Sequence, residues 1–191
     1  MRKDAKRNRE RITTVARELI AIQGGEVSME AIAAGAGVAV GTLYRHYPTK
    51  ADLIAAVIEN SLGEVAEMAL AADEAIAAGC NAREELADLL RSIARRGSEN
   101  RALRAAALSL GLPNYLRPDE NPPSPGSSLS TVLGALDRVL ASARNAGVLR
   151  DDVTRMDLTV LLAGLLDIQL DESSRDRYVE IILTGLRPPG A

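Results

Sequence analysis

Apolar residues recur along most of the chain with the spacing of an α-helix. Near the start, Ile12, Val15, Ala16, Leu19 and Ile20 fall at i, i+3, i+4, i+7 and i+8, which places them on one helix face. No stretch alternates apolar and polar residues for long enough to predict a strand, and no segment repeats another. The pattern therefore predicts an all-α fold of about nine helices.

Glycines and prolines divide this pattern into segments. Five of the eight prolines fall within 113–127, which predicts a loop between helices. We expect a small domain over 1–50 and a second helical domain over 51–191, linked by a helix that begins at Lys50. The predicted helices span about 6–23, 28–35, 39–46, 50–78, 82–96, 98–110, 128–146, 154–170 and 174–186.

Residues 28–48 predict two short helices joined by a tight turn. Ser28 is a good N-cap for the first helix, and Gly35-Ala36-Gly37 ends it, because glycine tolerates a positive φ. A second helix follows over about 39–46, and Pro48 stops it, since the residue before a proline avoids the helical region. Two short helices with a turn of small residues form a helix-turn-helix, whose second helix can enter the major groove of DNA.

Four short motifs in this stretch carry a family resemblance. They are Ile32-Ala33, Ala36-Gly37-Val38, Thr42-Leu43-Tyr44 and His46-Tyr47-Pro48-Thr49-Lys50, and together they resemble the tetracycline-repressor (TetR) family of bacterial transcription regulators. The resemblance covers about residues 7–60. It implies a DNA-binding N-terminal domain and a C-terminal domain that dimerises and binds an effector. Tyr47 departs from the phenylalanine usual in the family, and we expect its ring in the core with the hydroxyl at the edge.

The net charge of −3 is unevenly distributed along the chain. Residues 1–50 hold 9 Lys and Arg against 5 Asp and Glu, whereas residues 51–191 carry a net charge of −7. A nucleic-acid partner requires such a local basic patch and not a basic protein overall. Taken alone, the basic segment is equally well explained as a solvated tail.

The outward positions of the second short helix carry the predicted DNA contacts. Arg45 is the best candidate for a contact with a guanine edge, although a phosphate contact is an equal alternative. Thr42 suits a phosphate or a thymine methyl group, and Gly41 lets the backbone approach the duplex closely. The predicted set is Ser28, Val40, Gly41, Thr42, Tyr44, Arg45, His46 and Lys50.

Three of these residues are assigned mainly through the resemblance. It implies phosphate or sugar contacts for Tyr44 and His46, and a phosphate contact for Lys50. A lysine at a helix N-terminus is unfavourable with the helix dipole alone, and a nearby phosphate would explain it. Each has a simpler alternative, a packed surface tyrosine for Tyr44 and a solvated side chain for His46 and Lys50.

The segment 157–170 is apolar almost all round. One of its stripes can pack on its own domain, and the other needs a partner or a central position. A buried core helix is one interpretation, whereas the resemblance favours a four-helix interface between two subunits. The predicted interface residues are Leu158, Leu162, Leu165, Tyr178, Ile182 and Leu186. A two-fold dimer implies an operator in double-stranded DNA that is an approximate inverted repeat.

The effector is expected to be a small apolar or amphipathic molecule, since the helices from about 53 to 146 supply mainly Leu, Ala and Ile. The candidate lining residues are Met68, Leu86, Leu103, Leu108 and Tyr115. For each of them, plain core is the simpler and favoured interpretation.

Composition argues against several other classes of protein. The chain has no Phe and no Trp, so aliphatic residues must build the core. One His and one Cys cannot form the usual zinc sites, and no glycine-rich phosphate loop follows a strand, so we expect neither an enzyme nor a cofactor. No apolar run reaches the ~18 residues of a membrane span, and the start lacks the apolar stretch of a signal peptide, which predicts a soluble cytoplasmic protein.

These observations together predict a dimeric, ligand-responsive repressor of transcription. The alternative is a helical ligand-binding or protein-interaction module without specific DNA binding.

Overall fold

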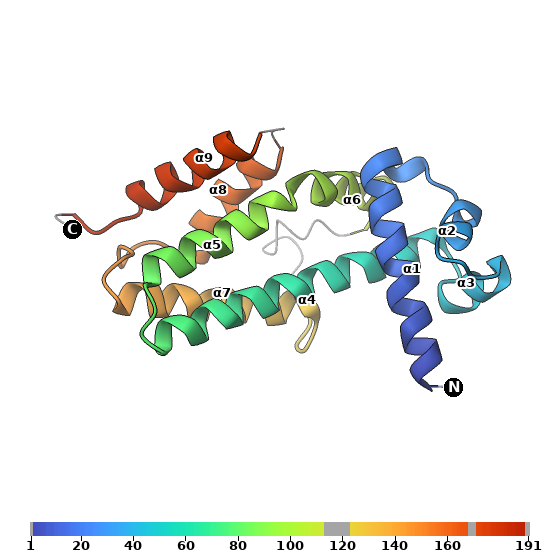
Figure 1. Cartoon of the computed structure of the whole chain (residues 1–191), viewed down its shortest axis with the longest axis horizontal. Helices are drawn as coiled ribbons and strands as arrows, with labels where there is room; N and C mark the ends of the chain where they lie inside the picture. Colours follow the sequence, from blue (N-terminus) through green and yellow to red (C-terminus); the bar gives the residue numbers. More distant parts are fainter. Residues whose placement is uncertain (1, 113–122, 168–170, 190–191) are drawn as a thin grey trace. The chain divides into compact units, whose positions relative to one another are not determined.

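The computed structural model describes residues 2–112, 123–167 and 171–189, without the side chains of 2–5, 97–100 and 162–167. Over these residues the chain forms nine α-helices, one short 3-10 helix and no strand, which confirms the predicted all-α fold (Figure 1). The elements are α1 (Arg2–Gln23), η1 (Gly24–Glu26), α2 (Met29–Gly35), α3 (Val40–His46), α4 (Lys50–Ala77), α5 (Ala82–Arg95), α6 (Gly97–Ser109), α7 (Ser128–Asn145), α8 (Arg155–Asp167) and α9 (Glu172–Gly185).

The chain divides into two compact units. The first comprises Met1–Ser61 and Glu99–Asn121, and the second comprises Leu62–Ser98 and Pro122–Ala191. The predicted boundary at residue 50 therefore falls inside the first unit, because the start of α4 and most of α6 belong with the N-terminal helices. The functional division between 1–50 and 51–191 stays a prediction.

In the first unit, α1 packs against α2 and η1, and α2 packs against α3 (Figure 1). Ile12, Ala16 and Ile20 of the predicted α1 stripe are fully buried. The end of α2 lies so close to α1 that a Cβ added at Gly35 would be 2.8 Å from Val15 Cγ1. Glycine at this position is therefore needed for close packing between the two helices.

One polar bond fastens α1 to α4 inside the first unit. The buried hydroxyl of Thr13 accepts a hydrogen bond of 2.8 Å from Asn60 Nδ2 and donates back to carbonyl oxygens of its own helix. The buried hydroxyl of Thr13 is thereby satisfied, while Asn60 lies at the surface. The bond ties the part of α4 around Asn60 to α1.

In the second unit, α5 contacts α7, α8 and α9 (Figure 1). The apolar stripe of α5 is buried and built from Leu86, Leu89 and Leu90 with Ile93. Arg91 on α5 forms ion pairs with Asp176 and Glu180 on α9, and Arg83 also pairs with Glu180. The core of this unit is aliphatic, as the absence of Phe and Trp predicts.

Candidate nucleic-acid interface

The turn between α2 and α3 is built by the residues that the sequence singled out. Ser28 caps α2, since its Oγ accepts a hydrogen bond of 3.1 Å from the Ala31 N–H. Gly37 adopts φ +60°, the conformation that glycine tolerates. Arg11 on α1 donates from Nη2 to the Gly37 carbonyl oxygen at 3.2 Å, a tie across 26 residues that sequence spacing gave no means of finding. The turn is therefore held by its own backbone and by α1.

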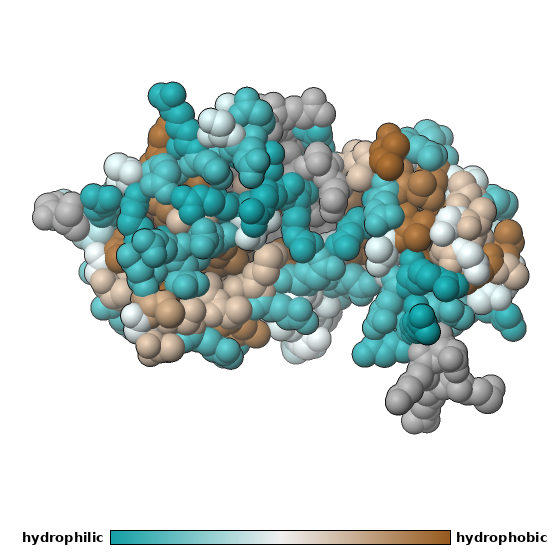
Figure 2. Space-filling view, in the orientation of Figure 1, coloured by the Kyte–Doolittle hydropathy of each residue, from teal (hydrophilic) through white to brown (hydrophobic). Residues whose placement is uncertain are grey.

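Helix α3 presents one face to the core and the other to solvent. Leu43 is fully buried and Tyr47 is 5% exposed, so these two residues anchor the helix to the core. Val40 and Tyr44 remain 39% and 42% exposed, and Figure 2 shows hydrophobic residues among polar ones over α2 and α3. Gly41 and Arg45 are exposed, whereas Thr42 and His46 are half-buried. The predicted contacts on α3 thus lie on one solvent-facing surface.

Tyr47 differs from the expectation in one respect. Its hydroxyl oxygen is fully buried and has no hydrogen-bond partner among the described residues, so the hydroxyl is not at the edge of the core. Burial raises the pKa of this phenol above its ordinary value of 10.0, while the positive charge of Arg9 acts in the opposite direction. The expectation was wrong because the whole ring enters the space that a phenylalanine would fill.

The surface of α3 leaves room at Gly41. A Cβ added there would meet no atom within 4 Å, and the backbone has no positive φ. Nothing in the described protein therefore requires glycine at this position. A close approach of another molecule to the backbone of α3 would require it, as the sequence predicts for DNA.

Arg45 folds back along α3 and does not extend freely into solvent. Its Nε donates to the Gly41 carbonyl oxygen at 3.3 Å, and its Nη2 donates to Thr42 Oγ1 at 3.1 Å. Both bonds lie within one turn of the same helix. The guanidinium is thereby kept over the first half of α3.

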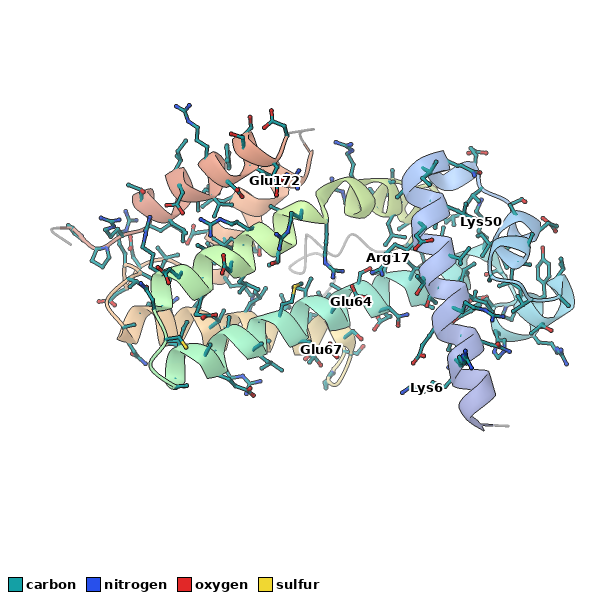
Figure 3. All side chains as sticks on the ribbon, viewed as in Figure 1. Lys6, Arg17, Lys50, Glu64, Glu67 and Glu172 are labelled. Atoms are coloured by element: carbon teal, nitrogen blue, oxygen red, sulfur yellow. The ribbon has the colours of Figure 1, made fainter. Side chains whose placement is uncertain are left out.

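Lys50 has an internal partner at the N-terminus of α4. Its Nζ donates to the carbonyl oxygen of Gly25 in η1. Lys50 is labelled in Figure 3. This bond explains a lysine at a helix N-terminus without any phosphate, so the dipole argument alone does not require DNA. An ammonium group carries three N–H donors, and a phosphate contact by Lys50 stays a prediction.

The predicted effector residues fall in both units. Leu103 and Leu108 lie on α6 in the first unit, where Leu103 is buried and Leu108 is half exposed. Met68 and Leu86 lie in the second unit, where Met68 is half-buried and Leu86 is fully buried. Neither unit holds the whole predicted set, and Tyr115 lies outside the described residues. An effector site built from these residues stays a prediction.

The predicted dimer stripe on α9 packs largely within its own chain. Ile182 is buried against Ala94 of α5, and Tyr178 and Leu186 pack beside this pair. Leu158 on α8 is also buried, so neither Leu158 nor Ile182 presents its side chain at the surface. The side chains of Leu162 and Leu165 lie outside the described residues.

Other apolar residues of α8 and α9 remain at the surface. Val160 and Ile181 are 62% and 59% exposed, and Met156 is also exposed. The apolar residues of these segments correctly predicted two helices, but their spacing does not show which stripe faces α5. The interface predicted from Leu158 and Ile182 stays a prediction, although both side chains are buried within their own chain.

Two properties of the described residues concern other classes of function, namely membrane proteins and metal-binding proteins. None of the helices there is both long and apolar enough to cross a membrane. The same residues bring together no group of three or more His, Cys, Asp and Glu side chains able to hold a metal ion.

Two family models cover most of the chain. The model described as "Bacterial regulatory proteins, tetR family" matches residues 12–57. The model described as "Transcriptional regulator SbtR-like, C-terminal domain" matches residues 81–188, which is more than half of the chain. The first match contains the helix-turn-helix, and the second contains α5 to α9.

Individual relatives agree with these matches. A TetR transcription regulatory protein from Mycobacterium vanbaalenii is 32% identical, with 98% of this chain and 99% of that chain covered and a TM-score of 0.72. A TetR transcriptional regulator from Streptomyces coelicolor is 26% identical, with coverage of 95% and 99% and a TM-score of 0.70.

An HTH-type transcriptional regulator from Staphylococcus aureus is 49% identical over 63 residues, 32% of this chain and 34% of the relative. The chain thus matches about a third of the length of that curated relative.

Proposed function

The chain belongs to the TetR family of bacterial regulatory proteins, and from this premise we propose that it is a dimeric repressor released from its operator by a small effector. The family consists of transcription factors with a helix-turn-helix DNA-binding domain and not of enzymes.

The observation that carries the proposal is the solvent-facing surface of α3. Its polar groups stand on a helix that Leu43 and Tyr47 fix to the core, so they are presented in a rigid arrangement. Rigid positioning lowers the entropy lost on binding. The basic charge of residues 1–50 supports the same partner, because phosphates attract it without regard to sequence.

The test is a gel shift and footprint with DNA from the protein's own gene neighbourhood. We expect a defined protected site that survives an excess of random competitor DNA. Equal affinity for all fragments would support the alternative, a helical ligand-binding or protein-interaction module without specific DNA binding. The affinity should also fall steeply with salt, because phosphate contacts release counterions.

The proposed dimer is formed by the exposed apolar residues of α8 and α9. Val160 and Ile181 are large side chains that water would otherwise surround, and the two helices pack against each other. A second copy of the chain that brought the same surface would bury them with two-fold symmetry. Leu158 and Ile182 then support the interface from within their own chain and do not form it.

Sedimentation at micromolar concentration tests this interface. We expect a dimer for the wild type and monomers for Val160→Glu and Ile181→Glu, because a charge buried without a partner is costly. Ile22→Glu is the matched control, since Ile22 is an equally large side chain that is 79% exposed in the first unit. A wild-type monomer, or a dimer that persists in both variants, would contradict the proposal.

The proposed effector is a small apolar or amphipathic molecule bound by the helices after residue 53. Met68 and Leu86 are the candidates that lie in the second unit. Coupling between two ligands is reciprocal, so an effector that weakens operator binding must itself bind the operator complex more weakly. Molecules found by thermal-shift screening would be titrated with and without operator DNA, and a typical coupling changes both affinities by about 5- to 150-fold. Equal effector affinities would show that the molecule is not an inducer.

A further inference from the structure

The contacts of Arg45 use one edge of its guanidinium group. Nε and Nη2 donate to the Gly41 carbonyl oxygen and to Thr42 Oγ1, and these two nitrogens share the edge on which the Nε–H lies. The Gly41 contact is made by backbone, so Thr42 supplies the only side chain in this arrangement. The hydroxyl of Thr42 thus determines the direction of the guanidinium group.

The opposite end of the guanidinium stays open. Arginine has five N–H donors, and Nη1 forms no hydrogen bond within the part of the chain that the structure describes. Nη1 and Nη2 therefore keep a pair of parallel N–H groups that form no hydrogen bond with the described residues. In the major groove only guanine presents two acceptors side by side, O6 and N7, whereas adenine presents an acceptor next to a donor.

We propose that Thr42 is a positioning residue that holds Arg45 for bidentate recognition of one guanine in each operator half-site. The inference rests on the proposed DNA binding and adds which residues recognise a base of the operator. It also commits Arg45 to one of its two alternatives, and because the arginine fork matches a phosphate as well as a guanine edge, the dependence on the guanine N7 distinguishes them. Thr42 thereby acts on sequence preference through Arg45 and not through a DNA contact of its own.

The expected size of the effect of Thr42 follows from the conformational entropy that the Arg45 side chain loses when it binds DNA. An arginine immobilised only on binding costs affinity, and the bond to Thr42 removes part of that cost before DNA arrives. Thr42→Val keeps the shape of the side chain and removes the acceptor. We expect this variant to lose about 2- to 10-fold in preference for guanine over the other bases at the position that Arg45 contacts.

The experiment uses the full-length protein and the tightest sequence selected from a randomised DNA library. Each guanine of one half-site is replaced in turn by 7-deazaguanine, which lacks only the N7 acceptor. We expect one position at which this replacement weakens the wild type by about 5-fold or more. The penalty should vanish in Arg45→Ala, shrink in Thr42→Val and persist in the matched control Thr42→Ser, which retains a hydroxyl.

A double-mutant cycle separates positioning from direct contact. If Thr42 acts through Arg45, Thr42→Val has no further effect on sequence preference in an Arg45→Ala background. If Thr42→Val shows the full 7-deazaguanine penalty, the inference about Thr42 is overturned and the proposed DNA binding stands. The same holds if Thr42→Val loses affinity equally for all DNA sequences. If the wild type selects no sequence at all, the proposed function itself is wrong.

Discussion

Tyr47 combines a well-packed ring with a buried hydroxyl oxygen in the first unit. Its ring is buried with the anchor Leu43, yet its hydroxyl has no partner among the described residues. A buried polar group without a hydrogen bond costs about 1–3 kcal/mol. The residue therefore fills space well and stabilises the helix-turn-helix less than a phenylalanine would.

Tyr47→Phe should raise the free energy of unfolding by about 1 kcal/mol, because the ring remains and the unsatisfied hydroxyl is removed. Since burial raises the folded pKa of Tyr47, the wild type should also lose stability as the pH rises through and above 10.0, and the variant should lose less. Urea unfolding at neutral and alkaline pH measures both effects. A loss of stability on substitution at neutral pH would show that the hydroxyl is satisfied in solution.

Gly41 allows stability and DNA binding to be separated at one residue. Gly41→Ala adds a methyl group to a helix position with open space around it, so the free protein should become more stable by up to about 1 kcal/mol. The same methyl group should weaken operator binding, because it stands where the duplex approaches α3. Thermal unfolding and anisotropy titration would show the two changes with opposite sign. Unchanged operator affinity would mean that DNA does not approach the backbone at Gly41.

The helices were largely predictable from the sequence, because their ends depend on local chemistry. The predicted helix over 82–96 begins where Asn81 caps α5, with its side chain accepting from the N–H groups of Arg83 and Glu84. The start of α9 was missed, since the structure uses Asp171 as the cap and begins the helix at Glu172. Asp171 three residues before Ser174 was the available signal, because this spacing suits a side chain that accepts from the N–H of Ser174.

Long-range partners were not predictable in the same way. Helices α8 and α9 each carry more than one apolar stripe, and periodicity alone cannot tell which stripe meets α5. The partner of Lys50 lies 25 residues away in η1, so no local rule reveals it. The candidate site was therefore predicted as a set of residues on α3. The bond between Arg45 and Thr42 depends on side-chain conformations that no sequence pattern reveals.

The N-terminus of α8 carries a pH-dependent cap. The hydroxyl and the N–H of Thr154 both donate to Asp157 Oδ2 at 2.7 Å, and these bonds lower the pKa of Asp157 below its ordinary value of 3.8. Because the folded pKa is depressed, the cap stabilises the protein above pH 3.8 and this contribution is lost as the pH falls through the folded pKa.

Asp157→Asn should therefore destabilise the protein at neutral pH, and the difference from the wild type should close as the pH falls below 3.8. Asp151→Asn is the matched control, since Asp151 is exposed near the same helix end and forms no described hydrogen bond. Unfolding curves from pH 3 to 7 measure the difference. A difference that persists unchanged at the acid end would show that the carboxylate charge is not what stabilises α8.

For the whole molecule, charge and symmetry are the properties that matter. The net charge of the chain is −3, so the basic N-terminal fifty residues attract DNA against a repulsive remainder. Two such segments in one dimer would bind two half-sites at once, and the second contact would benefit from the high effective concentration of a linked site. In the proposed function, dimerisation through α8 and α9 would therefore strengthen the operator binding that α3 provides.

The most direct test is the stoichiometry and affinity of the protein on its selected operator. Anisotropy and sedimentation would compare the intact inverted repeat with the same DNA in which one half-site is scrambled. We predict two chains on the intact repeat and, for the scrambled DNA, an affinity at least about fivefold lower, since one bidentate guanine contact alone is worth about 1–3 kcal/mol. One chain per operator, or equal affinity for both DNAs, would contradict a dimeric regulator that reads an inverted repeat.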